Sequence, residues 1–232
     1  MISAYMVRID IATSKLLTTV AKLDDAAAAG PSLLPDWDRS MVVTHLAANA
    51  DGIRRAVEAA RAGVTGEVYP GGKEARDAEI EAGRALPAEK LNLRLDTACR
   101  LFRVALGEAS DDIWDAPAIG PKGKVHIGPG LVVARLREVE VHHVDLDYGY
   151  KPEDWPVEWV LEEMDRAMLD LPSRLPPDTA VVLSATDADQ RWVAGSGNAV
   201  EVTGTTAELF AWVIGRSAHV RGVVCPPLAP WR

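Results

Sequence analysis

Apolar residues recur every three or four positions through four long stretches of the chain, which is the period of an amphipathic α-helix. These stretches are 5–23, 42–57, 91–106 and 131–146. Glycines and prolines separate them, as they commonly separate helices. Helices with one apolar face bury those faces against one another as a bundle. The pattern therefore predicts a four-helix bundle over residues 1–150, with an additional short polar helix over 73–83.

The pattern changes after residue 150. Prolines mark a linker there, and the helical period returns over 157–171. Three short runs rich in β-forming residues follow at 180–183, 191–193 and 199–202, and an apolar helix is expected between 205 and 215. The segment between the first two runs is typical of a hairpin. We therefore expect residues 151–232 to form a small α+β domain, which makes the fold class of the whole chain α+β.

Composition and charge narrow the class of protein. The 232 residues include 48% hydrophobic and 25% charged residues, which is average for a globular protein. Acidic residues outnumber basic ones by 34 to 25, and the resulting negative charge argues against a nucleic-acid partner. The chain has two cysteines, no C-x-x-C spacing, no basic leader and no apolar run of membrane-spanning length. We expect a soluble cytoplasmic monomer without a membrane partner.

The most polar of the predicted helices contains the sequence REVEVHHVDL at 137–146. Glu138 and His142 are four residues apart, so they lie on one face of a helix, and Asp145 continues that line and is placed to orient an imidazole. A simpler interpretation is a solvated stripe of charges. His143 falls on the apolar stripe of the same helix, where histidine is more often a packing residue, and it is the main rival of His142 as a metal ligand.

A third candidate ligand lies on another helix. His45 shares the apolar stripe of the 42–57 helix, and Asn49 lies one turn further along. A lone histidine at such a position is usually structural. Facing helices of a bundle do build metal sites, however, and one histidine plus a Glu-x-x-x-His pair supplies the three ligands of a zinc site that keeps an open position. A fourth ligand, for which Asn49 is the candidate, would instead indicate a closed structural site.

Arg216 follows Gly215 at the end of the last predicted helix. A cation is favoured there by the helix dipole, so the simplest interpretation of Arg216 is a C-terminal cap.

Other chemistries find less support. Residues 118–130 are rich in glycine and proline and are expected to form a flexible stretch, in which Lys124 and His126 receive no role. Nucleophile-elbow, Walker, dinucleotide-binding and H-E-x-x-H motifs do not occur. Cys99 lies on the apolar stripe of its helix, which is typical of a core residue rather than a nucleophile. Metal-assisted chemistry is the class that these exclusions leave.

Several segments together resemble the mycothiol-dependent maleylpyruvate isomerase family. They are WDRSMVVTHLA at 37–47, REVEVHHVDL at 137–146, GYKPEDWP at 149–156 and the pattern of 202–216. The resemblance covers nearly the whole chain and implies a DinB-like four-helix bundle followed by the C-terminal domain of that family. It also implies a zinc ion held by His45, Glu138 and His142, in preference to His143, with water completing the coordination.

The resemblance also implies a reaction and two further residues. Mycothiol, a low-molecular-weight thiol, would add to the cis double bond of the small-molecule substrate maleylpyruvate, and rotation followed by elimination would give fumarylpyruvate. Arg216 would face the zinc and pair with a substrate carboxylate, and Arg76 looks like a further family position without an assigned role. In a related mycothiol S-transferase the thioether would be released. The remaining alternative is a non-catalytic two-domain protein that binds an apolar ligand or a partner.

Overall fold

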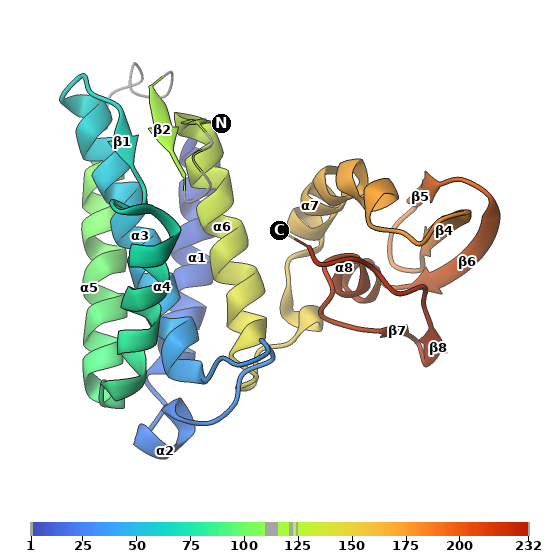
Figure 1. The fold of residues 1–232 in the computed structure, drawn as a ribbon, viewed down its shortest axis with the longest axis horizontal. Coiled ribbons are helices and arrows are strands. Elements are labelled where there is room, and N and C mark those ends of the chain that lie inside the picture. Colours follow the sequence, from blue (N-terminus) through green and yellow to red (C-terminus); the bar gives the residue numbers. More distant parts are fainter. Residues whose placement is uncertain (1, 110–115, 121–122, 124, 232) are drawn as a thin grey trace. The chain divides into compact units, whose positions relative to one another are not determined.

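The structure is a computed structural model that describes residues 2–109, 116–120, 123 and 125–231 of the 232-residue chain. The chain divides into two compact units, Met1–Tyr150 and Lys151–Arg232 (Figure 1). Mixed helices and strands confirm the predicted α+β class. Among the described residues, no helix combines the length and the apolar character that crossing a membrane requires.

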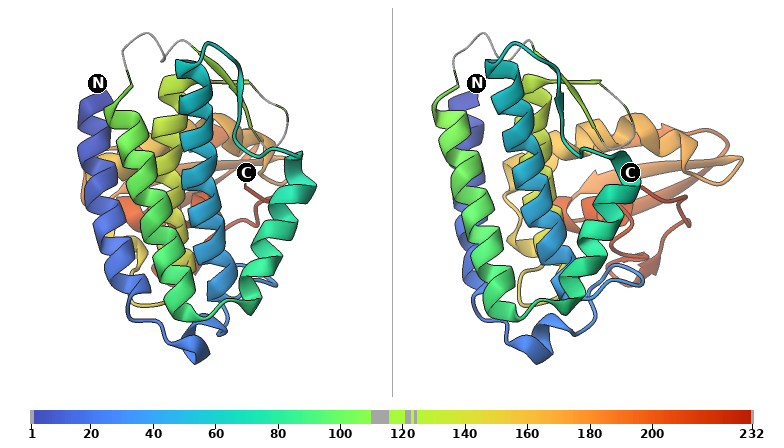
Figure 2. Two further views of the ribbon diagram at one scale, coloured as in Figure 1. Left: turned by 90° about the vertical axis from the view of Figure 1, so that its left-hand side faces the viewer. Right: turned by 60° about the vertical axis from the view of Figure 1, so that its left-hand side comes forward.

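Four long helices build the first unit, as the hydrophobic period predicts. They are α1 (Ile2–Val20), α3 (Arg39–Arg61), α5 (Ala88–Gly107) and α6 (Gly128–Asp145). Helices α1 and α3 each pack against both α5 and α6, so the four close into a bundle, and Figure 2 shows them side by side. The apolar stripes supply its core, which includes Ile9, Leu16, Leu46, Ile53, Leu91, Leu95 and Leu136, all fully buried.

The ends of these helices follow from local sequence. Asp38 caps α3, because its Oδ1 accepts a hydrogen bond of 2.9 Å from the backbone N–H of Met41. Pro87 stands at the N-cap of α5, where the missing N–H of proline costs no hydrogen bond within the helix. The polar helix expected at 73–83 is α4 (Gly72–Ala82), which packs on the outside of α3 and continues into the 3-10 turn η1 (Gly83–Ala85). A one-turn helix, α2 (Asp25–Ala28), precedes α3.

A small sheet replaces much of the flexible stretch expected at 118–130, so that prediction is wrong for the described part. Strand β2 (Pro117–Ile119) pairs in parallel with β1 (Gly66–Glu67) and antiparallel with β3 (Val125–Ile127), and α6 begins directly afterwards. Gly66 permits this arrangement, since a Cβ there would lie 2.5 Å from the Cα of Ala56 on α3. His126 is paired with Ala118 in the sheet, and Lys124 lies outside the described residues.

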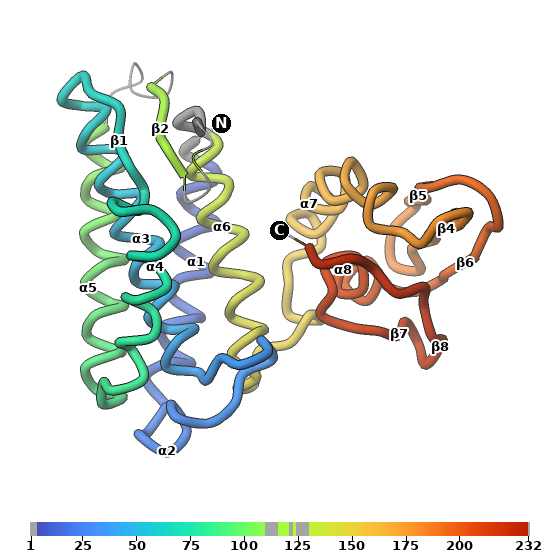
Figure 3. The backbone as a smooth tube through the Cα atoms, in the orientation of Figure 1, coloured from blue at the N-terminus to red at the C-terminus, as the bar shows by residue number. Residues whose placement is uncertain are grey.

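The second unit begins with η3 (Pro152–Asp154) and helix α7 (Val157–Asp170), which ends in η4 (Leu171–Ser173). The expected strands are β4 (Thr179–Ala185), β5 (Arg191–Gly195) and β6 (Asn198–Gly204), followed by helix α8 (Thr206–Val213) and a small ladder of β7 (His219–Val220) and β8 (Val223–Val224). The sheet order is β5-β4-β6, with β4 antiparallel to β5 and parallel to β6. The tube in Figure 3 follows this path.

One face of that sheet forms the core of the second unit. Leu183 in β4 lies between Trp192 in β5 and Val202 in β6, and all three are buried. Helix α8 packs on β4 and β6, and Trp192 donates a hydrogen bond of 3.2 Å to Asp165 Oδ1 of α7. The period-two alternation of β5, with every second residue exposed, therefore marks a sheet with one covered face.

Candidate metal centre

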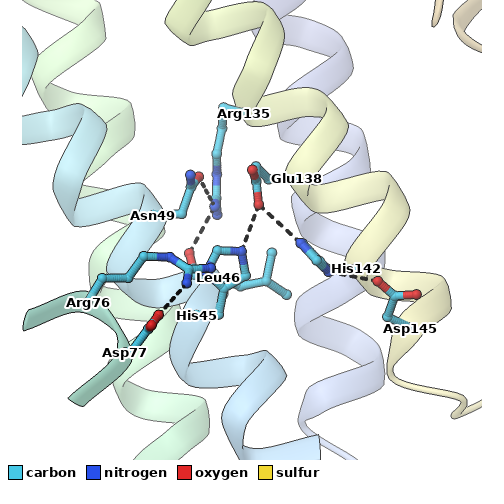
Figure 4. A network of polar contacts seen from close by, with 9 residues as sticks. All are labelled: His45, Leu46, Asn49, Arg76, Asp77, Arg135, Glu138, His142 and Asp145. Carbon is cyan, nitrogen blue, oxygen red and sulfur yellow. Dashed lines mark hydrogen bonds and ion pairs between the residues drawn. The ribbon is translucent and has the colours of Figure 1, made fainter. Parts of the chain in front are cut away.

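Helices α3 and α6 bring three potential metal ligands together in the first unit (Figure 4). Glu138 Oε2 lies 2.8 Å from His45 Nε2 and 3.2 Å from His142 Nε2. The ligand atoms of the three residues all lie within 4.8 Å of one another, and within the described part of the chain they form the one such cluster of His, Cys, Asp and Glu side chains. Two imidazole nitrogens and one carboxylate oxygen are a donor set that fits zinc or a similar first-row ion.

Asp145 orients one of these imidazoles, as its position in the sequence predicts. Its Oδ2 lies 2.8 Å from His142 Nδ1, and the carboxylate is fully buried at the end of α6. The proton on Nδ1 is donated to Asp145, so Nε2 is the ring nitrogen that faces the cluster and would bind a metal ion after losing its own proton. Buried carboxylates commonly fix metal-binding histidines in this way.

His143 has a different environment from its neighbour. Its Nε2 lies 2.8 Å from Thr19 Oγ1 of α1, and its ring stacks on Tyr150 with centroids 3.8 Å apart. The side chain is buried and lies on the α1 side of α6. These contacts are those of a packing residue, and the choice of His142 over His143 as the metal ligand stays a prediction.

The protonation of the cluster follows from burial and from its own charges. Burial lowers the pKa of His45 to about 4 against the opposing effect of Glu138. Burial also acts on His142, but hydrogen bonds and charges from Asp145 and Glu138 outweigh it and raise the pKa of His142 to about 9. Burial raises the pKa of Glu138, but the two histidines outweigh it and hold that pKa well below its usual range. A metal ion therefore competes with the proton that His142 carries beside the ionised Glu138.

Asn49, the candidate fourth ligand, makes a contact that the sequence did not indicate. Its Oδ1 accepts a hydrogen bond of 2.9 Å from Nη1 of Arg135, which also donates to the backbone oxygen of Leu46 at 2.9 Å. Nη2 of the same guanidinium lies 3.4 Å from the sulfur of Cys99, which is buried as predicted. The oxygen of Asn49 is thus engaged by a buried arginine. The one sequence feature that could have pointed to Arg135 is its position, since it is a cation on the apolar side of α6, one turn before Glu138.

Arg76 and two aromatic residues border the cluster on the α4 side. Arg76 Nη2 lies 3.4 Å from His45 Nδ1, and Nη1 donates to Asp77 Oδ1 at 2.8 Å. The central carbon of the guanidinium lies 6.0 Å from the ring centroid of Trp37 and 5.7 Å from that of Tyr69. Burial raises the pKa of Tyr69, and the charge of Glu138 adds to this effect. Sequence reasoning named Arg76 without a role and missed Tyr69, which precedes α4 in a segment without periodicity.

Arg216 lies in the second unit, directly after α8. Gly215 has a φ of +78°, which ends the helix, and Arg216 Nη1 donates a hydrogen bond of 3.1 Å to the backbone oxygen of Ile214. This contact is what a C-terminal cap makes. A role for Arg216 toward a metal-bound substrate stays a prediction.

Comparisons with known proteins relate the chain to one family. The model described as the mycothiol maleylpyruvate isomerase N-terminal domain matches residues 9–147. Two solved structures, of the mycothiol-dependent maleylpyruvate isomerase and of a point mutant of it, are each 24% identical to this chain, with TM-scores of 0.89 and 0.88. Each match covers 100% of this chain and 97% of the solved chain, and at this identity it establishes a shared fold. No curated protein matches the chain.

Proposed function

The chain belongs to the mycothiol maleylpyruvate isomerase N-terminal domain family, and from this premise we propose that it is a zinc-dependent enzyme that uses mycothiol to convert maleylpyruvate to fumarylpyruvate. The observation that carries the proposal is the convergence of His45 Nε2, Glu138 Oε2 and His142 Nε2. A structural metal site needs a fourth protein ligand, whereas three ligands leave a position for a reactant. The engagement of Asn49 by Arg135 supports the open arrangement.

The side chains of the cluster have separate tasks in this proposal. His45 stays neutral at pH 7 because burial keeps its pKa at about 4, so its nitrogen lone pair is free to bind a metal ion. Asp145 holds the tautomer and the orientation of His142. Glu138 contributes the single negative charge of the ligand set. A zinc ion held by two neutral ligands and one carboxylate is a good Lewis acid, which favours the ionised form of a thiol at neutral pH.

The test is the activity of the zinc-loaded full chain with mycothiol and maleylpyruvate. We expect fumarylpyruvate to accumulate while the amount of mycothiol stays constant. Accumulation of a thioether, with maleylpyruvate or with another electrophile from a panel, would instead identify a mycothiol S-transferase. Absence of turnover with every electrophile, from protein that carries zinc, would contradict an enzymatic role and support the non-catalytic alternative.

We also propose Arg216 as the catalytic residue that pairs with a substrate carboxylate, on the strength of the family pattern. Arg216→Ala is then expected to keep zinc and fold while lowering turnover by about 10- to 100-fold, the effect of losing one charge-assisted hydrogen bond. Arg216→Lys should recover part of the loss, because lysine keeps the charge but not the planar fork. If both variants lower thermal stability and keep the specific activity, Arg216 is a helix cap only.

A further inference from the structure

We propose that Arg135 is a positioning residue for the metal cluster, because it fixes the register of α3 against α6 and so the distance between His45 and the pair of Glu138 and His142. This inference rests on the proposed function, since it concerns the same metal site. The side chain of Arg135 is fully buried in the bundle. Arginine is not itself a metal ligand, so its effect on the metal acts through the helices that carry the ligands.

A single guanidinium joins α6 to α3 next to the cluster. Nη1 of Arg135 donates hydrogen bonds of 2.9 Å to the backbone oxygen of Leu46 and to Oδ1 of Asn49, both on α3. Leu46 directly follows the candidate ligand His45, and Asn49 lies one turn further along. Figure 4 draws both bonds together with the contact between His45 and Glu138.

The contact of Arg135 and the contact of the ligands lie in consecutive layers between the two helices. On α6, Arg135 and Glu138 are three residues apart and share a helix face. On α3, His45 and Asn49 are four residues apart and also share a face. The bond from Arg135 to Asn49 therefore lies one helical turn, about 5 Å, from the contact of the two ligands.

The register matters because the ligands come from both helices. His45 is on α3, whereas Glu138 and His142 are on α6. Sliding a helix by one residue moves its side chains by about 1.5 Å along the axis and turns them by about 100°. Distances from a metal ion to its ligands hold within about 0.2 Å. A contact that fixes the register one turn away therefore keeps the ligands at the spacing that a metal ion requires.

Helix α5 supports the same guanidinium. Nη2 of Arg135 lies 3.4 Å from Cys99 Sγ, and the central carbon lies 5.9 Å from the ring centroid of Phe102, in the range of a cation–π contact. Both residues are on α5, which packs against α3. The two helices together hold the guanidinium in one place, and α6 is positioned through it.

Stability alone does not account for an arginine at this position. Within the described part of the chain, the partners of Arg135 are a carbonyl, an amide and a thiol, and none of them is a carboxylate. Its Nε–H makes no hydrogen bond with any described residue. Burying a charge without an opposite charge costs free energy, and well-packed apolar residues often serve a core at least as well. The best-attested role of such a buried polar group is to select one register between helices.

The experiment measures zinc affinity by competition against a zinc-binding indicator, and the visible absorption spectrum of the cobalt-loaded full chain. We expect Arg135→Met to bind zinc about 10- to 100-fold more weakly, the range found when residues that orient metal ligands are replaced. The cobalt spectrum should change as well, because it depends on the geometry of the ligands. Arg135→Lys should lie between, because lysine keeps the charge but loses the rigid planar group.

The matched control is Arg174→Met in the second unit. Arg174 is also buried, and its guanidinium donates to the backbone oxygens of Val213 and Ala229. This variant should lower thermal stability and leave both the zinc affinity and the cobalt spectrum unchanged. Affinities are measured at a temperature at which the metal-free form of each variant is folded. If Arg135→Met does not fold, Arg135→Lys takes its place and should still bind zinc more weakly than the wild type.

Equal zinc affinity and equal cobalt spectra of the wild type and the Arg135 variant would overturn the inference. A loss of affinity that Arg174→Met shares would also overturn it, because the loss would then reflect stability in general. Absence of metal binding by the wild type would overturn both the inference and the proposed function. Mycothiol-dependent turnover is measured on the same samples. Turnover with a zinc affinity independent of Arg135 refutes the role of Arg135 alone, whereas Arg135-dependent zinc affinity without turnover refutes the proposed function alone.

Discussion

Replacing Asp145 with asparagine tests whether the orientation of His142 governs metal binding. The carboxylate is fully buried and accepts the Nδ1 proton of His142 at 2.8 Å. Asparagine keeps the shape and still offers an oxygen, but it removes the negative charge. A hydrogen bond to a charged group contributes about 1 kcal/mol more than a neutral one, so zinc affinity should fall about 5- to 10-fold. Asp145→Ala, which also removes the acceptor, should approach the roughly 100-fold loss seen when such orienting partners are deleted.

The assay is a competition titration of the full chain against a zinc-binding indicator of known affinity. Glu140→Gln is a matched control, because Glu140 is another buried carboxylate of α6, which accepts a hydrogen bond of 2.6 Å from the hydroxyl of Tyr150. It should leave zinc affinity unchanged. Thermal unfolding in excess chelator checks that each variant is folded. An Asp145→Asn variant with wild-type zinc affinity, or a Glu140→Gln variant that loses as much, would show that the contact with His142 does not tune the metal site.

Three further predictions follow from other contacts. His142→Ala should lose its zinc, whereas His143→Ala should keep it, and metal analysis of both variants checks this. His143→Ala should instead lower the free energy of unfolding by about 2–4 kcal/mol, because it leaves a cavity in the core, and denaturant unfolding measures that loss. The double variant Cys99→Ala with Cys225→Ser replaces both buried cysteines. It should retain mycothiol-dependent turnover per folded molecule, since the reactive sulfur belongs to the thiol cofactor. The hydrogen bond from the backbone N–H of Thr205 lowers the pKa of Glu208 from its ordinary value of 4.5, so Glu208→Gln should lower the free energy of unfolding at pH 7. The difference in unfolding free energy between the variant and the wild type should shrink as the pH falls below 4.5 through the folded-state pKa, which denaturant unfolding at several pH values will measure.

The period of the apolar residues was sufficient to predict the long helices but not the shortest strands. A helix such as α3 repeats its apolar stripe over many turns, so its inward face, including His45, was predictable from the sequence. Strands β7 and β8 have two residues each, and β2 and β3 have three, which is too short for any alternation to appear. Their pairing depends on contacts between distant parts of the chain, as between β1 and β2, and local propensity carries no record of these contacts.

Some residues of the candidate site were likewise predictable from the sequence, and others were not. Glu138, His142 and Asp145 share one helix face, so their spacing alone predicted that they lie together. Arg135 of α6 and Arg76 of α4 contact residues of α3 that are 86 and 31 positions away in sequence. Nothing in the spacing of an arginine indicates which distant acceptor it will meet. Tyr69 was missed for the same reason, because its segment has no period from which a facing direction follows.

The choice between the two adjacent histidines depends on the order of helices in the bundle. Neighbouring residues on a helix point about 100° apart. Because α6 packs against α1 on one side and α3 on another, His143 meets Thr19 of α1 while His142 turns toward His45 of α3. If α1 and α3 exchanged places around α6, the same sequence would direct His143 toward His45 and would turn Glu138 and His142 away from it. The zinc content of His142→Ala and His143→Ala therefore reports on helix order in solution as well as on the identity of the ligand.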